Sequence, residues 1–244
     1  MRILIAADIH GNLDAFQAVL HNAEEAGSID LLWCPGDIVG YGPEPAACIA
    51  LVRQYPHIAI AGNHDFGVAG RIGTSEFNPA AAEAAMWTAG QLGYEDRRFL
   101  EQLPEVAYEG EFTLVHGSLR APLWEYVLSM QQMEAQFRLM ETRYSVVGHT
   151  HVPFLSEEGA DGRVWTSTWQ DGEVVNLPEA RLIINPGGVG QPRDGDPRAS
   201  YAMYDSDAST ITLHRVEYDV AATQQKIRDA GLPASLAERL AYGQ

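Results

Sequence analysis

The fold is decided by the stretch Arg2-Ile3-Leu4-Ile5-Ala6-Ala7-Asp8-Ile9-His10-Gly11-Asn12, which joins an apolar run, two polar side chains and a helix start. Residues 2–7 are continuously apolar, as is typical of a strand buried on both faces. Asn12 is a favourable N-cap for a helix whose apolar positions recur at helical spacing, and Gly27 ends that helix. The stretch therefore predicts a strand, a polar turn carrying Asp8 and His10, and a helix.

The same alternation continues along the chain. It predicts a strand at 30–34, a helix at 44–55 and a strand at 58–61, which together form a βαβαβ unit with parallel strands and right-handed crossovers. Further helices are expected at 78–93, 94–103 and 129–141, and further strands at 112–115 and 144–147.

The pattern changes after His151. Short β-prone runs separated by turn residues predict a mostly antiparallel sheet, with strands at 164–169, 173–177, 181–184, 200–204 and 210–217. Two helices, at 220–230 and 235–242, are expected to close the chain. Because no linker or repeat interrupts the sequence, we expect one domain over residues 1–244. Its class would be α/β (α+β), with two mixed sheets packed face to face and helices on both outer faces.

Composition limits the function classes. Of 244 residues, 46% are hydrophobic and 20% are charged, as in ordinary soluble globular proteins. The 33 acidic side chains outnumber the 16 basic ones, which argues against a surface that coats nucleic acid. A phosphorylated substrate remains compatible, because bound dications reverse the local charge. Cys34 and Cys48 are interpreted as small buried hydrophobes in a reducing compartment.

Neither a signal sequence nor a membrane anchor is expected. The apolar run before Asp8 is too short for a signal sequence, and no apolar stretch reaches membrane-spanning length. We therefore expect a cytoplasmic protein without a membrane partner.

Five short segments carry spaced histidines, carboxylates and an amide, and each stands where an apolar run gives way to polar residues. They are Asp8-Ile9-His10, Gly36-Asp37, Gly62-Asn63-His64-Asp65, Val115-His116-Gly117 and Gly148-His149-Thr150-His151. In an extended segment, side chains two residues apart point the same way, so Asp8 and His10 would face one site together, as would His149 and His151. Most of these segments follow predicted strands, at the sheet edge where ligands bind in open α/β proteins.

The side-chain chemistry predicts metal ions. Carboxylate, imidazole and amide ligands without a thiolate suit manganese, iron, zinc, cobalt or nickel rather than calcium. Seven such side chains exceed what one ion takes from a protein, so two divalent ions about 3.5–4 Å apart, bridged by one carboxylate, are expected. Each segment alone has a simpler interpretation: Gly-Asn-His-Asp is a common turn, and a histidine after a strand is usually structural. Their joint order favours the metal site.

This order of motifs resembles the calcineurin-like metallophosphoesterases over residues 8–151. The loop 185–193 is similar to one in a small bacterial and archaeal phosphodiesterase-like branch. The resemblance implies a four-layer fold of two sheets between helices. It also implies the metal ligands: Asp8, His10 and His151 for one ion, Asn63, His116 and His149 for the other, and Asp37 as the bridge.

The resemblance further implies that His64 is a catalytic residue beside the substrate phosphate. A water bridging both ions would be hydroxide near neutral pH and would attack phosphorus in line with the leaving oxygen. Asn12 and Arg193 are candidate substrate-binding residues, although the loop that carries Arg193 has the composition of an ordinary turn. Trp124 follows the His116 segment and is either a packing residue or part of the pocket wall.

One segment departs from the family. The phosphoprotein-phosphatase and symmetrical dinucleotide-tetraphosphatase branch has Gly-Asp-x-Val-Asp-Arg-Gly, whereas this chain has Gly40 in place of the second Asp and Tyr41 in place of the Arg. The missing Arg weakens the case for a phosphomonoester, whose second negative charge calls for an arginine fork. The missing Asp leaves open what orients His64, with Asp65 as a candidate.

We therefore expect a metal-dependent phosphodiesterase acting on a small phosphorylated substrate, of which a nucleotide is one candidate. A phosphomonoesterase, a protein phosphatase or a dinucleotide-polyphosphate hydrolase is the alternative. A non-catalytic interaction module on the same fold is disfavoured, because none of the expected ligands is missing.

Overall fold

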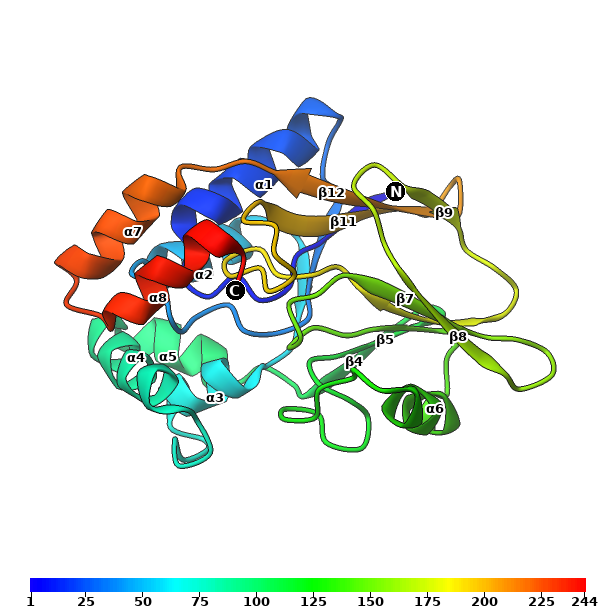
Figure 1. The fold of residues 1–244 in the computed structure, drawn as a ribbon, viewed down its shortest axis with the longest axis horizontal. Helices are drawn as coiled ribbons and strands as arrows, with labels where there is room; N and C mark the ends of the chain where they lie inside the picture. The colour runs from blue at the N-terminus through cyan, green and yellow to red at the C-terminus, as the bar shows by residue number, and fades with distance from the viewer.

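The computed structural model describes all 244 residues, and they form two six-stranded mixed sheets packed face to face (Figure 1). Helix α1 (Leu13–Glu25) packs on the outer face of the first sheet, and helix α6 (Met130–Leu139) packs on that of the second. The fold class predicted from the sequence is confirmed.

The first sheet has the strand order β3-β2-β1-β11-β12-β9. Strands β1 (Arg2–Ile5), β2 (Leu31–Cys34) and β3 (His57–Ala59) are parallel, as the βαβαβ pattern predicts. The other three are antiparallel to their neighbours: β11 (Ala199–Asp205), β12 (Thr210–Val216) and β9 (Val174–Asn176). Strand β1 therefore lies between one partner close in sequence and one about two hundred residues away, since Arg2 is opposite Asp205.

The second sheet has the strand order β4-β5-β6-β10-β7-β8. Its strands are β4 (Val106–Glu109), β5 (Phe112–Val115), β6 (Tyr144–Val146), β10 (Arg181–Asn185), β7 (Phe154–Glu158) and β8 (Val164–Thr168). The three central strands β5, β6 and β10 are parallel, and the outer pairings are antiparallel.

The remaining helices follow the predicted positions closely. They are α2 (Pro45–Gln54), α4 (Pro79–Gln91), α5 (Tyr94–Glu101), α7 (Val220–Asp229) and α8 (Ala234–Glu238), with a final 3₁₀ turn η1 (Arg239–Tyr242). Asn12 caps α1 as predicted, since its side-chain oxygen accepts from the backbone N–H of Ala15 at 3.1 Å.

The structure differs from the sequence-based expectation in three ways. The strands after His151 do not form one sheet of their own; they extend both sheets, and β10 runs parallel to β6. Strands β4 and β7 were not predicted, because they are short and lack a clear alternation. The Gly-Asn-His-Asp motif is not only a turn, because helix α3 (Asn63–Ala69) begins inside it and Asp65 accepts from the backbone N–H of Gly62 at 2.9 Å.

The core has two main layers. One lies between the sheets, where Trp33 of β2 packs edge-on against Phe112 of β5 with ring centroids 4.9 Å apart. The other lies between the first sheet and helices α1 and α2, and it includes Phe16 and Tyr201. Strands β1 and β2 contribute to both layers, which explains why their sequences are continuously apolar. This packing fixes the strand ends that carry the polar loops.

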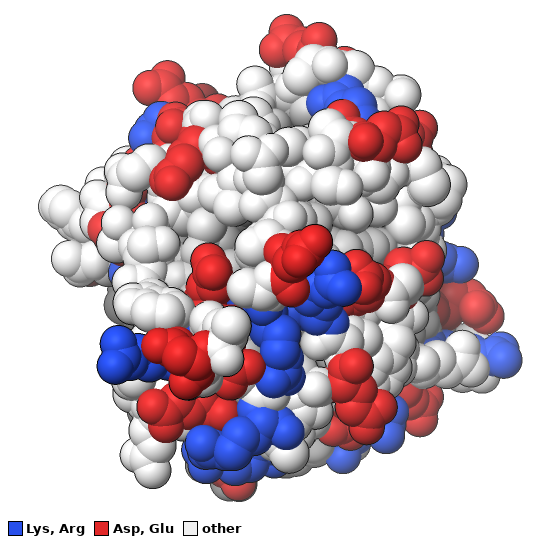
Figure 2. Space-filling view, turned by 90° about the vertical axis from the view of Figure 1, so that its right-hand side faces the viewer, with Lys and Arg blue, Asp and Glu red and all other residues white.

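On the face that Figure 2 shows, acidic and basic side chains lie close to one another and gather mostly over its lower half and its edges. That face presents no continuous basic surface, in keeping with the net charge of −17. None of the helices is long and apolar enough to cross a lipid bilayer.

Candidate metal centre

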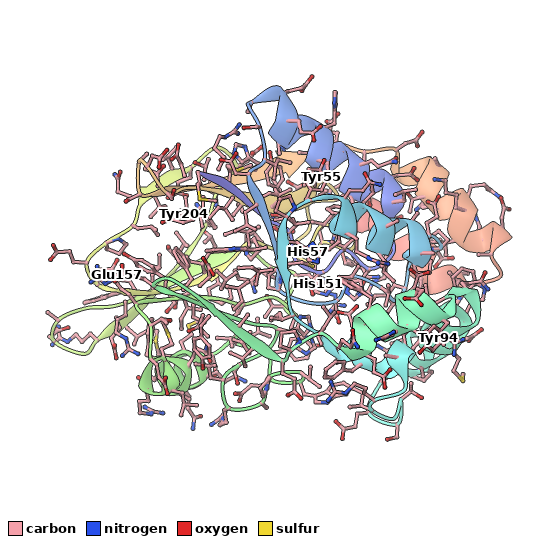
Figure 3. The ribbon with its side chains drawn as sticks, turned by 180° about the vertical axis from the view of Figure 1, so that it is seen from behind. Tyr55, His57, Tyr94, His151, Glu157 and Tyr204 are labelled. Carbon is pink, nitrogen blue, oxygen red and sulfur yellow. The ribbon has the colours of Figure 1, made fainter.

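The five motif segments meet at the ends of the strands that precede them, on one edge of the two sheets. The loops after β1, β2, β5 and β6 and the first turn of α3 converge there, and Figure 3 shows His151 deep within the molecule. All seven predicted ligand side chains are buried, with exposed fractions between 0 and 4%. A set of buried carboxylates and imidazoles of this kind needs compensating partners or ions.

The predicted ligands fall into two groups. Asp8, His10 and His151 form the first, with the Nε2 atoms of the two histidines 3.2 Å apart and Nε2 of His151 3.4 Å from Asp8 Oδ1. His116 and His149 form the second together with Asp37, and Nε2 of His116 lies 3.1 Å from Nδ1 of His149.

Backbone carbonyl groups fix which nitrogen of each imidazole is free. Nδ1 of His10 lies 3.2 Å from the oxygen of Val39, and Nδ1 of His151 lies 2.6 Å from that of Gln191. A carbonyl oxygen only accepts, so both Nδ1 atoms are protonated and both Nε2 atoms carry lone pairs. Burial lowers the pKa of both histidines well below the ordinary value, so two lone pairs face each other at 3.2 Å. That contact is favourable only with a cation between the two nitrogens.

In the second group, too, backbone carbonyl groups fix which imidazole nitrogen is free, but the free nitrogen is a different one in His149. Nδ1 of His116 donates to the oxygen of Pro35 at 2.9 Å, but in His149 it is Nε2 that donates, to the oxygen of Trp124 at 3.2 Å. The free atoms are therefore Nε2 of His116 and Nδ1 of His149. Burial alone would lower the pKa of His116, but the charge and hydrogen bond of Asp37 outweigh it and raise the pKa to about 9. In the metal-free protein a proton on His116 takes the place of the ion.

Asn63, which the family resemblance assigns to the second group, lines the same cavity as Asp37 and His149. Its side-chain oxygen is buried and has no hydrogen-bond partner, although buried polar atoms are almost always paired. An unpaired amide oxygen from a residue that shares a cavity with a carboxylate and imidazoles fits a role as ligand of a divalent transition-metal ion.

Asp37 lies between the two groups. Its Oδ2 atom is 3.5 Å from Nε2 of His10 and 3.3 Å from Nε2 of His116, and its Oδ1 atom accepts from the backbone N–H of His64 at 2.9 Å. Burial would raise the pKa of Asp37, but His116 and His64 hold it well below its usual range. Burial raises the pKa of Asp8, assisted by the charge of Asp37, to about 7.

The loops that present these side chains are not extended. Seven residues other than glycine have positive φ, and six of them belong to this site: Asp8, His10, Asp37, Tyr41, His149 and His151. The left-handed backbone is unfavourable for such residues and persists only where the surroundings enforce it. The extended geometry expected from the sequence is therefore wrong. Asp8 and His10 do share a group, but His149 and His151 turn to different groups.

His64 lies beside the first group, in an aromatic surround. Its ring centroid is 4.4 Å from that of Tyr41 and 4.8 Å from that of Phe77. Its Nδ1 atom is buried without a partner, and burial lowers the pKa of His64 to about 4. The geometry also permits a ligand role, because a nitrogen of His64 clusters with donor atoms of His10 and Asp37.

No carboxylate orients His64: Asp65 is engaged elsewhere, and position 40, where the phosphatase branch has an aspartate, is a glycine. Asp65 instead accepts from the backbone N–H groups of Asp37, Val39 and Gly62 at 2.8, 3.1 and 2.9 Å, so that expectation is wrong. At Gly40, where φ is +94°, an added Cβ atom would lie only 2.4 Å from His64 Nδ1. The histidine ring occupies the space that an aspartate side chain would need, and aromatic packing takes over the positioning.

A cavity of about 60 Å³ opens beside the second group. Asp37, Asn63, His64, His149 and His151 line it, together with Tyr41, Glu76, Phe77, Asn78, Ala81, Trp124, Tyr126 and Arg193. Trp124 therefore belongs to the wall, and the structure brings Arg193 to the same cavity. Asn12 is not among these residues: its side-chain nitrogen donates to the oxygen of Gly190 at 2.9 Å, so both ends of the amide contact protein.

Sequence reasoning missed Tyr126, whose ring stacks on His149 with centroids 3.9 Å apart and planes 17° apart. It also missed Arg239 of η1. The charge of Arg239 lowers the pKa of Tyr41, and burial and the charge of Arg193 lower the pKa of Arg239 itself. Neither residue stands in a motif, and their positions depend on how distant segments fold back onto the site.

The profile of the calcineurin-like phosphoesterase superfamily domain matches residues 1–209 of this chain. The chain belongs to this superfamily. A crystal structure of a metallophosphoesterase from Sphaerobacter thermophilus is 48% identical, with a TM-score of 0.90 over 100% of this chain and 99% of that one. An uncharacterised protein of Methanocaldococcus jannaschii is 36% identical over 99% of this chain and 98% of its own length.

Two more distant relatives have named activities. The phosphodiesterase YfcE of Escherichia coli is 27% identical over 86% of this chain and 91% of its own length. A symmetrical bis(5'-nucleosyl)-tetraphosphatase of Vibrio vulnificus is 26% identical, over 74% of this chain and 64% of its own length.

Proposed function

We propose that this metal-dependent phosphoric ester hydrolase binds two divalent transition-metal ions and cleaves phosphodiester bonds. The contact between Nε2 of His10 and Nε2 of His151 at 3.2 Å carries the proposal, because both atoms have lone pairs and face each other across the place of a cation. Asp8, His10 and His151 would hold one ion, and Asn63, His116 and His149 the other, with Asp37 between them. Bound ions would activate water and offset negative charge on the phosphoryl group.

The side chains of the protein would orient the metal ligands, bind the substrate phosphate and assist the departure of the leaving oxygen. Backbone carbonyl groups hold each histidine with the ligand nitrogen turned inward, which is how metal-binding imidazoles are oriented. Arg193 would contact the non-bridging oxygens of the substrate phosphate, and His64 would hydrogen-bond the departing oxygen. Because the pKa of His64 is low, the neutral imidazole is the form that would do so. Phe77 and Trp124, 5.2 Å apart, would keep bulk water from the cavity.

A diester is favoured over a monoester because of the residue at position 41. The arginine that the phosphatase branch carries there is Tyr41 in this chain, so the additional charge of a monoester has no guanidinium at that position. Asn12 remains a candidate for substrate binding, but its present hydrogen bonds to Ala15 and Gly190 would have to be released first. A non-catalytic role is disfavoured, because every ligand is present and buried.

The test is a comparison of bis(p-nitrophenyl) phosphate with p-nitrophenyl phosphate, both assayed with Mn²⁺ at the same pH. We expect the larger kcat/KM for the diester, since the leaving group is the same and the monoester carries an additional negative charge where the diester carries its second aryl group. A clear preference for the monoester would place the protein with the phosphatases. Absence of hydrolysis of either ester, with both ions bound, would reject the proposed function.

A further inference from the structure

Tyr126 lies flat against His149, one of the ligands proposed for the second ion. Their ring centroids are 3.9 Å apart and their planes differ by only 17°. By contrast, the rings of His10 and Tyr41 are 4.6 Å apart and inclined at 56°. Tyr126 is 41% exposed and His149 only 4%, so the tyrosine ring shields the imidazole from solvent. The parallel contact also restricts the plane of the imidazole ring.

The loop that carries Tyr126 holds His149 by a second contact. Nε2 of His149 donates to the oxygen of Trp124 at 3.2 Å. Because an imidazole N–H points along the ring plane, this hydrogen bond fixes how the ring is turned within its plane. Its length is at the long end of the usual range, so without the stack the plane could tilt. Together the two contacts direct Nδ1 of His149 toward Nε2 of His116, 3.1 Å away.

Hydrogen bonds within the loop 117–126 fix its shape. Ser118 Oγ accepts from the N–H groups of Arg120 and Ala121 at 3.2 and 3.1 Å. The same hydroxyl group donates to the carboxylate of Glu125, which also pairs with Arg120. The loop folds back so closely that a Cβ atom added at Gly117 would lie 2.9 Å from the oxygens of Ala121 and Glu125. The segment is therefore a compact turn rather than a mobile connection.

Gln136 of α6 ties this loop to the strand that leads to His149. Its side chain is fully buried; Oε1 accepts from the N–H of Leu119 at 2.7 Å, and Nε2 donates to Ser145 Oγ of β6 at 2.9 Å. Breaking either bond would leave a buried polar group unpaired, so both are expected to persist. The loop and His149 therefore keep a fixed relative position, and Tyr126 forms a rigid surface for the imidazole.

A bound ion would strengthen the contact between the two rings. An imidazole that binds a dication loses electron density, whereas the face of a phenol ring is negatively polarised. The attraction between the rings is then larger with the ion than without it. Since such coupling is reciprocal, the stack raises the affinity for the ion.

We propose that Tyr126 is a positioning residue that orients His149 and thereby sets how tightly the second ion binds relative to the first. The inference rests on the proposed function, because it needs two ions held by the two ligand groups. The aromatic contacts of His10 and His151 do not include Tyr126, so the effect belongs to the second ion. Groups that orient a metal ligand contribute about 10–100-fold to metal affinity.

Calorimetric titration of the metal-free protein with Mn²⁺ tests this role without relying on activity. For Tyr126→Ala we expect about tenfold weaker binding in the step that Asn63→Ala also weakens, and no change in the other step. Tyr126→Phe should keep the wild-type affinities, because the ring makes the contact. Tyr126→Leu, which keeps an apolar cover without a flat ring, should show the same loss as Tyr126→Ala.

Tyr94→Ala is the matched control, since Tyr94 is exposed at the start of α5 and does not line the metal cavity. Unfolding of each metal-free variant in urea checks that the fold is kept, as expected for a change at an exposed side chain.

Unchanged affinities for both ions in Tyr126→Ala would overturn the proposal, as would a loss confined to the step that Asn63→Ala leaves unchanged. A raised KM for bis(p-nitrophenyl) phosphate with unchanged metal affinities would make Tyr126 a wall of the substrate cavity only. If the wild type binds both ions but hydrolyses neither ester, the weaker binding in Tyr126→Ala still supports the positioning role while the proposed reaction fails. A wild type that binds fewer than two ions would overturn both.

Discussion

Asp37 is the carboxylate on which both ligand groups depend. Its Oδ2 atom lies within 3.5 Å of a histidine from each group, whereas Asn63 is proposed as a ligand of one ion only. We expect Asp37→Ala to lose more bound metal than Asn63→Ala, because the first change removes a ligand from both ions and leaves two dications without a shared negative charge. Metal analysis of the purified variants measures this. Equal occupancy in the two would argue against a bridging role.

His64 provides a second prediction for a single residue. If His64 contacts the substrate and not the ions, His64→Ala should keep both ions and lose much of kcat. The loss should be largest, on the order of 10²–10³-fold, for esters with basic leaving groups, because the hydrogen bond that the neutral imidazole donates matters most where the departing oxygen carries the most negative charge. A series of aryl esters with graded leaving groups measures this. Loss of metal together with activity would make His64 a ligand. An equal loss of kcat for all esters of the series would indicate that His64 stabilises charge on the non-bridging phosphoryl oxygens instead.

The residues of the site were more predictable than their geometry. The histidines, carboxylates and asparagine were found because they stand in motifs at strand ends, and the structure brings them together. The left-handed backbone at Asp8, His10 and His149 was not foreseen, because non-glycine residues rarely adopt it and no local sequence signal marks it. The packing of His64 against Tyr41 and Phe77 depends on tertiary contacts and has no motif.

The helix α1 is tied to the rest of the site through its cap. Asn12 caps α1 and also donates to the carbonyl group of Gly190, whereas Asn78 only caps α4, accepting from the N–H of Ala81 at 3.0 Å. Asn12→Ala should therefore cost about 1–3 kcal/mol more of unfolding free energy than Asn78→Ala, because it also leaves a buried carbonyl group unpaired.

Urea denaturation of both variants measures the difference, and equal losses would show that the contact with Gly190 contributes nothing. The KM of Asn12→Ala, measured well below its melting temperature, tests the substrate-binding role separately.

Most helices and strands were predictable because their apolar periodicity is strong. The assignment of later strands to two sheets was not, because pairing between β1 and β11 is a long-range choice that alternation alone does not determine.

For the molecule as a whole, metal binding links stability to pH. In the metal-free protein the pKa of Asp8 is raised to about 7 and that of His116 to about 9, so the folded state binds protons that the unfolded state releases at lower pH. These two groups therefore stabilise the metal-free fold at low pH and lose that effect as pH rises through 7 and 9. Ions at the proposed site would need Asp8 ionised and His116 neutral, so they would compete with protons.

We expect the increase in melting temperature on adding Mn²⁺ to be larger at about pH 8.5 than at about pH 6, because fewer protons must then be displaced. Thermal unfolding with and without the ion at both pH values measures the effect, and Asp37→Ala serves as the control that binds poorly at either. A larger increase at the lower pH would contradict the assignment of Asp8 and His116 as ligands.

The position of β1 between β2 and β11 has a consequence for synthesis on the ribosome. Strand β1 can pair with β11 only after Asp205, the residue opposite Arg2, has been synthesised. The hydrogen bond from Gly190 to the oxygen of Asp8 and the one from His151 to the oxygen of Gln191 likewise form only after residues near 190 have emerged. At about 5–20 residues per second the delay is on the order of ten seconds or more. A nascent chain therefore carries its first ligands long before it can hold a metal ion, and loading belongs to the last stage of translation or follows it.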